Sequence, residues 1–147
     1  MIDELDRKIV RVMNQNARKS YREIAKEVGT SVTAVIHQVK KMEQTGVIKG
    51  FVPVVDPEHF GYTLIAIIAL RISKGKLLET QRIVSQDPRV SAVYDVTGEW
   101  DSLVIGYFKG RDDLNDFIKQ VLALRYVDRT VTHMVLNVVK DEKRVAV

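Results

Sequence analysis

Several side chains of the helix predicted over residues 31–46 have the chemistry needed to read the edges of DNA bases. Val35, Val39 and Met42 recur at positions i, i+4 and i+7, so this stripe of the helix is predicted to be buried. The other positions near the helix start face outward, where amide, imidazole and hydroxyl groups can hydrogen-bond to bases and apolar groups can contact thymine methyls. The candidate base-reading residues are Thr33, Ala34, Ile36, His37, Gln38 and Lys41.

Basic side chains around the same helix can contact phosphate groups, which positions a protein on DNA without reading its sequence. Residues 1–50 contain ten Lys and Arg against six Asp and Glu, whereas residues 51–147 contain thirteen of each. The whole positive excess therefore lies beside the candidate helix, as a nucleic-acid interface requires. For any single basic side chain, a solvated surface position is the alternative. The candidate phosphate contacts are Arg18, Lys19, Arg22, Lys40 and Lys41.

Three short helices are predicted to position these side chains. Apolar residues at helical spacing predict the first helix over about residues 3–15. Ser20 and Glu23 form a capping box that opens the second helix, and Gly29 can end it in a left-handed conformation. Ser31 is a good N-cap for the third helix. This spacing indicates a helix-turn-helix, in which the third helix enters the DNA major groove.

The rest of the chain alternates between β-rich runs and helical segments. Pro53 limits the run from Phe51 to Val55 to an edge or hinge strand, because proline has no N–H to donate. Strands are predicted over residues 63–72, 90–96, 103–108 and 127–139, and helices over residues 76–86 and 112–122. The order βαββαβ predicts a ferredoxin-like module, so the fold class is α+β.

Two of these strands carry apolar residues on both faces, which predicts self-association. Residues 63–72 are almost continuously apolar, and both sets of alternating positions in residues 127–139 include apolar side chains. Two helices can cover only one face of a four-stranded sheet, so the second face requires another subunit. We therefore expect a homodimer formed sheet to sheet.

Two sets of sequence motifs together span nearly the whole chain. The first set is Ile24 to Ser31, Val35, Val39, Met42-Glu43 and Gly46 to Ile48. The second set is Asp56-Pro57, Phe60 to Tyr62 and Thr97 to Asp101. They resemble the winged-helix-like DNA-binding domain and the effector-binding domain of the Lrp/AsnC, or feast/famine, transcription regulators. Gln38 and Thr30 depart from the resemblance, because the family commonly has arginine and an apolar residue at these positions.

The resemblance implies a prokaryotic transcription regulator that dimerises through its second module, often assembles dimers into octamers and binds amino acids between dimers. It also implies a pocket around the loop from residue 98 to 101 and part of the last strand. Carboxylates there could meet an α-ammonium group and threonine hydroxyls could hold an α-carboxylate, although ordinary hairpin chemistry is the alternative. The candidate effector-binding residues are Gly98, Glu99, Trp100, Asp101, Thr130, Thr132 and His133.

The expected organisation is a helix-turn-helix DNA-binding domain over 1–50, a hinge strand and linker over 51–62, and an effector-binding and oligomerisation domain over 63–147. The expected function is sequence-specific binding of double-stranded DNA, regulated by a small-molecule effector of the amino-acid class. A ligand-independent architectural DNA-binding protein is one alternative. An enzyme with a ferredoxin-like domain is another, since this fold also hosts catalysis.

Composition argues against several other classes of protein. The chain has no cysteine, which excludes disulfides and thiolate chemistry and fits a reducing compartment. The longest apolar run, Leu64 to Leu70, is far shorter than the roughly 20 residues of a membrane helix, and no export signal is visible. We therefore expect a cytoplasmic protein without membrane contact.

The candidate catalytic and RNA-binding signals are weak. The three histidines His37, His59 and His133 lie on different predicted elements without metal-ligand spacing, so no metal, cofactor or enzymatic activity is expected. Tyr107-Phe108 supplies aromatic residues on a strand but not in the order used by RNA-recognition strands, so RNA binding ranks low.

Overall fold

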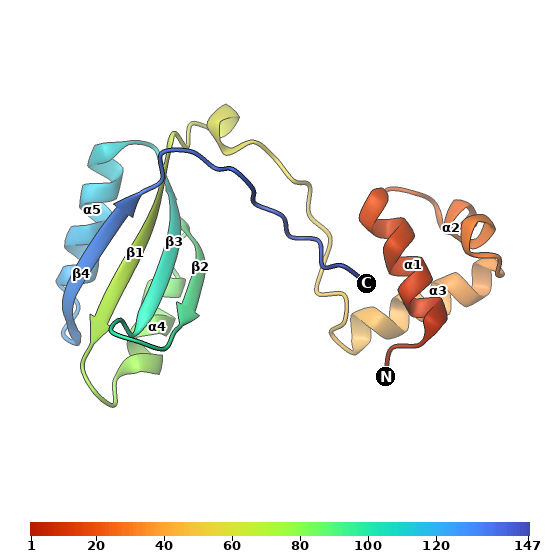
Figure 1. Ribbon diagram of the computed structural model, residues 1–147, viewed down its shortest axis with the longest axis horizontal. Helices are drawn as coiled ribbons and strands as arrows, with labels where there is room; N and C mark the ends of the chain where they lie inside the picture. Colours follow the sequence, from red (N-terminus) through yellow and green to blue (C-terminus); the bar gives the residue numbers. More distant parts are fainter. The chain divides into compact units, whose positions relative to one another are not determined.

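The computed structural model describes all residues from Met1 to Val147, and the chain forms two compact units (Figure 1). The first unit contains residues 1–54 together with 141–147, and the second contains residues 55–140. Each unit has its own hydrophobic core. None of the helices is both long enough and apolar enough to cross a bilayer.

The first unit is built from α1 (Glu4–Gln15), α2 (Tyr21–Val28) and α3 (Val32–Gln44), as the sequence predicts. The capping box of Ser20 and Glu23 opens α2, and Gly29 ends it with φ 74°, a left-handed conformation that glycine adopts without strain. The Ser31 hydroxyl then accepts a hydrogen bond from the Ala34 N–H at 3.1 Å and starts α3. Side chains from all three helices fill the core: Ile9, Met13, Ile24, Ala25, Val35, Val39 and Met42.

The second unit is an antiparallel sheet covered by two helices. Its strands are β1 (Leu64–Ile72), β2 (Val90–Asp95), β3 (Ser102–Phe108) and β4 (Val127–Met134), in the order β2-β3-β1-β4. Between them run α4 (Leu77–Ser85) and α5 (Arg111–Leu122), which lie on the same side of the sheet (Figure 1). The βαββαβ order and the α+β fold class are thereby confirmed.

The two faces of this sheet are buried to different extents. Ala66, Ile68 and Leu70 of β1 point toward the helices and are inaccessible to solvent, packed with Phe108 and Phe117. The intervening β1 positions point to the other face, which no helix covers. Its side chains are half-buried or exposed in the single chain, apart from the buried Ala69, and we call them the open face: Ile65, Ile67, Ala69, Arg71, Ala92, Tyr94, Leu103, Ile105, Tyr107, Arg129, Val131 and His133.

Two predicted details of secondary structure were wrong. Residues 51–55 form no strand, because Pro53 lacks an N–H and no neighbouring strand is available; a short 3-10 helix, η1 (Pro57–Phe60), follows. The last strand ends at Met134 rather than at residue 139, because the pairing with β1 runs out just beyond it: the Val135 N–H still donates to the Ile65 carbonyl at 2.9 Å, and β1 itself begins at Leu64.

The segment 141–147 belongs to the first unit, although it follows the whole second unit in sequence and the sequence predicts it within the domain over 63–147. The Arg11 guanidinium donates a hydrogen bond to the Val147 carbonyl oxygen at 2.7 Å, and the Asn14 amide donates one to the Val145 carbonyl at 3.1 Å. The Arg144 guanidinium in turn donates to the Asn14 carbonyl at 3.2 Å. This C-terminal segment therefore lies along the second half of α1.

Candidate functional site

Three side chains on one stripe of α3 are free to meet a ligand from solution. Thr33, His37 and Lys40 are at positions i, i+4 and i+7, so they lie on the same side of the helix. All three are exposed, and none makes a side-chain hydrogen bond or ion pair within the chain. The opposite stripe of α3 is locked into the core, so the helix holds this exposed stripe in a fixed orientation.

Two further candidate residues of α3 are instead held by α1. The Gln38 amide donates a hydrogen bond to the Asp3 carboxylate at 2.9 Å. The Lys41 ammonium donates one to the Asp6 carboxylate at 2.9 Å and lies 3.6 Å from that of Asp3. Candidate residues Ala34 and Ile36 are half-buried beside them. Gln38 and Lys41 therefore brace α3 against the start of α1 in this structure.

The carboxylates of Asp3 and Asp6, at the start of α1, are held in position for these contacts. Asp3 and Asp6 form a capping box, in which each carboxylate accepts the backbone N–H of the other residue. The Asp6 N–H, followed by Gln38 and Lys41, lowers the pKa of Asp3. The hydrogen bond to Asp6 is the largest cause that raises the pKa of Lys41. Asp6 itself is fully buried, which sequence reasoning missed although the spacing of the two aspartates signals a cap.

The candidate phosphate contacts outside α3 fall into two groups. Arg18 and Arg22 are exposed, and neither guanidinium has a partner within the chain. Lys19 is half-buried and forms an ion pair with Glu27 of α2. Lys40, Arg18 and Arg22 thus offer uncommitted positive charge, whereas Lys19 and Lys41 do not.

The candidate effector loop joins β2 to β3. Asp101 anchors it to the end of β1: its carboxylate accepts the Ile72 N–H at 2.7 Å, and its own N–H donates to the Leu70 carbonyl at 3.0 Å. Gly98 has φ 107°, a backbone conformation that other residues rarely adopt, and the space where a Cβ would stand is empty. The loop therefore has a fixed end and an open tip.

Two arginines that sequence reasoning missed hold the rest of this loop. Arg71 and Arg129 are register partners on neighbouring strands of the open face. The Arg71 guanidinium donates to the Glu99 carbonyl, and Arg129 donates to the Glu99 carboxylate at 2.9 Å. The Arg129 guanidinium also lies 4.9 Å from the centre of the Trp100 ring, within the range of a cation–π contact. No sequence pattern indicates this cluster, because it depends on the pairing of β1 with β4.

The remaining candidate effector residues lie on different faces of β4. Thr130 and Thr132 pair in register with Leu70 and Ile68, so they point toward the helices and are half-buried. His133 is exposed on the open face. Within one chain, therefore, the loop meets Arg71 and Arg129 rather than the two threonines. The pocket implied by the resemblance requires the threonines of a neighbouring chain.

Comparisons with known proteins agree with this geometry. Residues 2–49 match a family model described as winged helix-turn-helix DNA-binding, and residues 65–145 match one described as the Lrp/AsnC ligand binding domain. The chain belongs to the Lrp/AsnC family. An HTH-type transcriptional regulator of Pyrococcus abyssi is 46% identical over 98% of both chains.

Solved structures of Lrp/AsnC regulators have the same fold. Escherichia coli AsnC is 27% identical, with a TM-score of 0.89 over 98% of each chain. A transcriptional regulator of Neisseria meningitidis in complex with L-Met is 24% identical, with a TM-score of 0.89 over 99% of this chain and 97% of that one. The protein is accordingly a DNA-binding transcriptional regulator of the Lrp/AsnC family with a ligand-binding domain.

Proposed function

We propose that this Lrp/AsnC regulator reads specific DNA sequences with the exposed stripe of α3. The observation that carries the proposal is that Thr33, His37 and Lys40 project together from a helix whose other side is fixed in the core. Thr33 and His37 can hydrogen-bond base edges, and Ala34 and Ile36 flank them with apolar groups suited to thymine methyls.

Charge on the first unit supports the same orientation. Lys40 lies on the exposed stripe, and the free guanidinium groups of Arg18 and Arg22 are available to bind phosphate groups. In this proposal Gln38 and Lys41 do not contact the DNA themselves. They fix the orientation of α3 through their hydrogen bonds to Asp3 and Asp6. Phosphate contacts contribute affinity and orientation, and base contacts contribute specificity.

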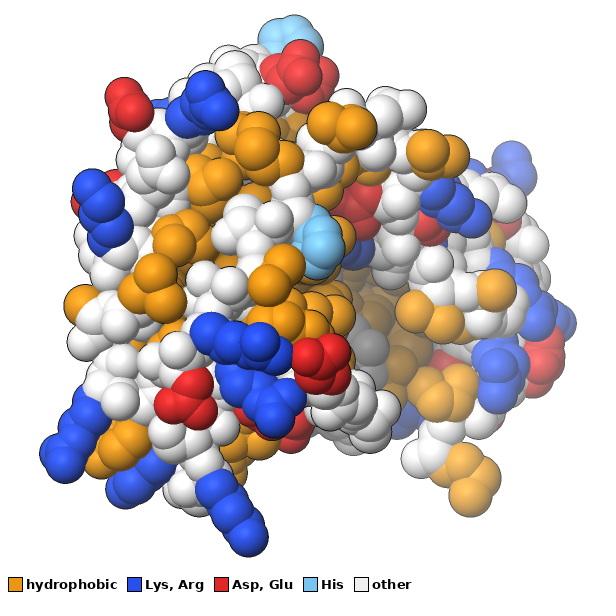
Figure 2. Space-filling model, turned by 60° about the vertical axis from the view of Figure 1, so that its left-hand side comes forward, with side chains coloured by type: hydrophobic (Ala, Val, Ile, Leu, Met, Phe, Trp, Pro, Cys, Tyr) orange, Lys and Arg blue, Asp and Glu red, His pale blue; other side chains and the backbone are white.

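The active species in this proposal is a homodimer formed through the open face. Hydrophobic side chains of this unit reach the surface, among them Val131 at 39% exposed, and Figure 2 shows such side chains in clusters. Pairing two open faces removes them from water, which is a favourable way to complete a sheet covered on one side only. A two-fold dimer presents two α3 helices to two related DNA half-sites. In this proposal residues 1–50 bind DNA, residues 51–62 are the linker, and residues 63–147 bind the effector and oligomerise, apart from residues 141–147, which pack on the first unit.

The effector in this proposal is an amino acid bound at the open tip of the loop around Gly98. The matched ligand-binding domain includes the whole loop, and a regulator of the same fold was crystallised with L-Met. The Glu99 carboxylate is paired with Arg129 but remains exposed, so it can exchange this partner for an α-ammonium group. Trp100 forms a wall of the site, and Thr130, Thr132 and His133 are supplied by a neighbouring chain.

Selection of bound DNA from a random pool, repeated with each of the twenty amino acids, tests both parts of the proposal. We expect a two-fold-related consensus sequence and a change in affinity with at least one amino acid, confirmed by calorimetric titration. Couplings between two sites are typically about 1–3 kcal/mol, so the change in DNA affinity is modest. Absence of DNA binding at low salt would reject the function. Specific DNA binding without a response to any of the twenty amino acids would favour the alternative of a ligand-independent architectural DNA-binding protein.

A further inference from the structure

Arg71 and Arg129 place two positive charges directly opposite each other on neighbouring strands. They are register partners of β1 and β4, and both side chains belong to the open face. Like charges at directly paired positions of an antiparallel sheet are destabilising. An anion that contacts both guanidinium groups removes this repulsion. The pair therefore marks a position on the surface where a carboxylate is favoured.

The chain supplies one such carboxylate from the loop between β2 and β3. The Glu99 carboxylate accepts a hydrogen bond from Arg129 at 2.9 Å, whereas Arg71 donates only to the Glu99 backbone carbonyl. Asp101, the other acidic residue of the loop, accepts the Ile72 N–H and forms no ion pair with either arginine. Two guanidinium cations thus share one carboxylate, which leaves one positive charge without a counterion.

The ion pair within the chain is easily exchanged for a pair with another molecule. The Arg129 and Glu99 side chains are 58% and 67% exposed, and an ion pair at such positions contributes little to stability. The Arg129 guanidinium lies 4.9 Å from the centre of the Trp100 ring, a contact that keeps its planar set of donors oriented when the carboxylate leaves. Beside them, the space next to Gly98 is empty. The loop can therefore release Glu99 and admit a carboxylate from solution.

We propose that the effector is an acidic amino acid, of the glutamate and aspartate class, whose side-chain carboxylate binds between Arg71 and Arg129. Its α-ammonium group then pairs with the Glu99 carboxylate that it displaces from Arg129. One ion pair within the chain is exchanged for two kinds of ion pair with the ligand. This inference rests on the effector site of the proposed function and assigns the specificity of that site.

Charge balance separates the acidic class from all other amino acids. At pH 7 an acidic amino acid carries one net negative charge, which neutralises the one uncompensated positive charge of the cluster. A neutral amino acid leaves that positive charge in place, and a basic amino acid adds a second. A dicarboxylate without an amino group can displace Glu99, but it leaves the Glu99 carboxylate without a cation. The two arginines and Glu99 therefore recognise the side-chain carboxylate and the α-ammonium group of the same ligand.

Calorimetric titration of the full chain with matched ligands tests the proposal on the wild type itself. Glutamate and glutamine have nearly the same size and differ in the charge of the side chain. We expect glutamate to bind at least about tenfold more tightly than glutamine, leucine or lysine, with a difference that shrinks as salt is raised. Glutarate, which lacks the ammonium group, should bind at least about tenfold more weakly than glutamate.

Substitutions separate the roles of the three side chains. Arg71→Met and Arg129→Met each remove a cation and keep an apolar stem, so we expect glutamate to lose most of its advantage over glutamine. Arg129→Lys keeps the charge without the planar fork and should keep part of that advantage. Glu99→Gln removes the competing carboxylate and also the partner of the ammonium group. We therefore expect it to bind glutarate more tightly than the wild type does and to discriminate less between glutamate and glutarate.

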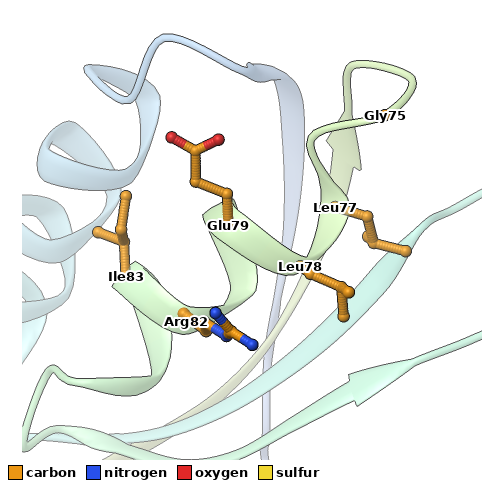
Figure 3. Close-up of a pocket in the computed structure, with 6 residues that line it drawn as sticks. All are labelled: Gly75, Leu77, Leu78, Glu79, Arg82 and Ile83. Carbon is orange, nitrogen blue, oxygen red and sulfur yellow. The ribbon is translucent and has the colours of Figure 1, made fainter.

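Arg82→Met is the matched control for the loss of an exposed arginine from the same unit. Arg82 lies on α4, on the opposite side of the sheet from the open face, where it lines an open hollow of about 680 Å³ together with Leu78 and Glu79 (Figure 3). Its guanidinium has no partner within the chain. We expect this variant to bind both glutamate and glutamine as the wild type does.

The outcomes separate this inference from the proposed function. If a neutral amino acid binds as tightly as glutamate, the inference is wrong and the effector site of the proposed function stands. If none of the twenty amino acids binds, both are wrong. Arginine variants that unfold at a lower temperature but keep the wild-type preference for glutamate would show that Arg71 and Arg129 only hold the loop, which also overturns the inference.

Discussion

Replacing two neighbouring lysines of α3 by methionine separates DNA contact from helix positioning. Lys40 is exposed and has no partner, whereas the Lys41 ammonium is bound by the buried Asp6 carboxylate at 2.9 Å. We therefore expect Lys40→Met to remove a phosphate contact. We expect Lys41→Met to remove none, because its charge is already committed to α1.

The salt dependence of DNA affinity gives this difference a magnitude. Each phosphate contact changes the slope of log K against log salt by about 0.9, so the loss of Lys40 from both chains of a dimer flattens the slope by about 1.8. Between about 50 and about 200 mM salt, wild-type affinity then falls about twelvefold more than that of Lys40→Met. For Lys41→Met we expect the wild-type slope.

The assay is fluorescence anisotropy with a selected DNA duplex over this salt range, with thermal unfolding of each variant as a control. Lys41→Met should unfold at a lower temperature than Lys40→Met, because it leaves a buried carboxylate without its cation. A slope that flattens equally in both variants would refute the reasoning. It would show that Lys41 leaves Asp6 and binds phosphate.

Three other variants test the second unit. Arg89 forms its closest ion pair with Asp87, at 2.7 Å, and lowers that group's pKa, so Arg89→Met should cost about 1–2 kcal/mol at pH 7 after discounting for solvent screening. This stabilisation is complete above the pKa of about 3.9 that the Asp87 carboxyl has in the unfolded chain, and it is lost as the pH falls through the lower pKa of this group in the folded protein. The difference in unfolding temperature between the wild type and Arg89→Met should therefore shrink in acid. Gly106→Ala places a Cβ 2.7 Å from the buried Phe108 ring and should destabilise the unit by about 1–3 kcal/mol in denaturant titrations; wild-type stability would mean that the ring moves aside freely. Ile67→Asp puts a charge in the middle of the open face and should convert a dimer to a monomer in light scattering, whereas an unchanged mass would place the dimer interface elsewhere.

The sequence was sufficient to predict the parts of the fold that local chemistry determines. The Ser20 capping box, the left-handed Gly29 and the buried stripe of α3 each depend on residues within about one or two helical turns. The exposed stripe with Thr33 and His37 follows from the same periodicity, so that part of the candidate site could be predicted as well.

Features that depend on long-range partners could not be predicted in this way. From the sequence alone, Gln38 and Lys41 have the same predicted role as their exposed neighbours on α3. Only the packing of α1 against α3 brings them to their partners Asp3 and Asp6. The face of β4 that carries Thr130 follows from its register with β1, and no single strand reveals its register. The cluster of Arg71 and Arg129 around the loop has the same origin.

The position of residues 141–147 against α1 has a consequence for the order in which the protein is completed during translation. The three helices contain their whole hydrophobic core within residues 5–48, so they can fold as soon as that stretch has left the ribosome. The hydrogen bonds that Arg11 and Asn14 make to the C-terminal segment must wait until residues 55–140 have been synthesised. One side of α1 therefore stays uncovered while the ligand-binding domain is made. A fragment ending at residue 54 would preserve this nascent form of the DNA-binding unit rather than its finished one.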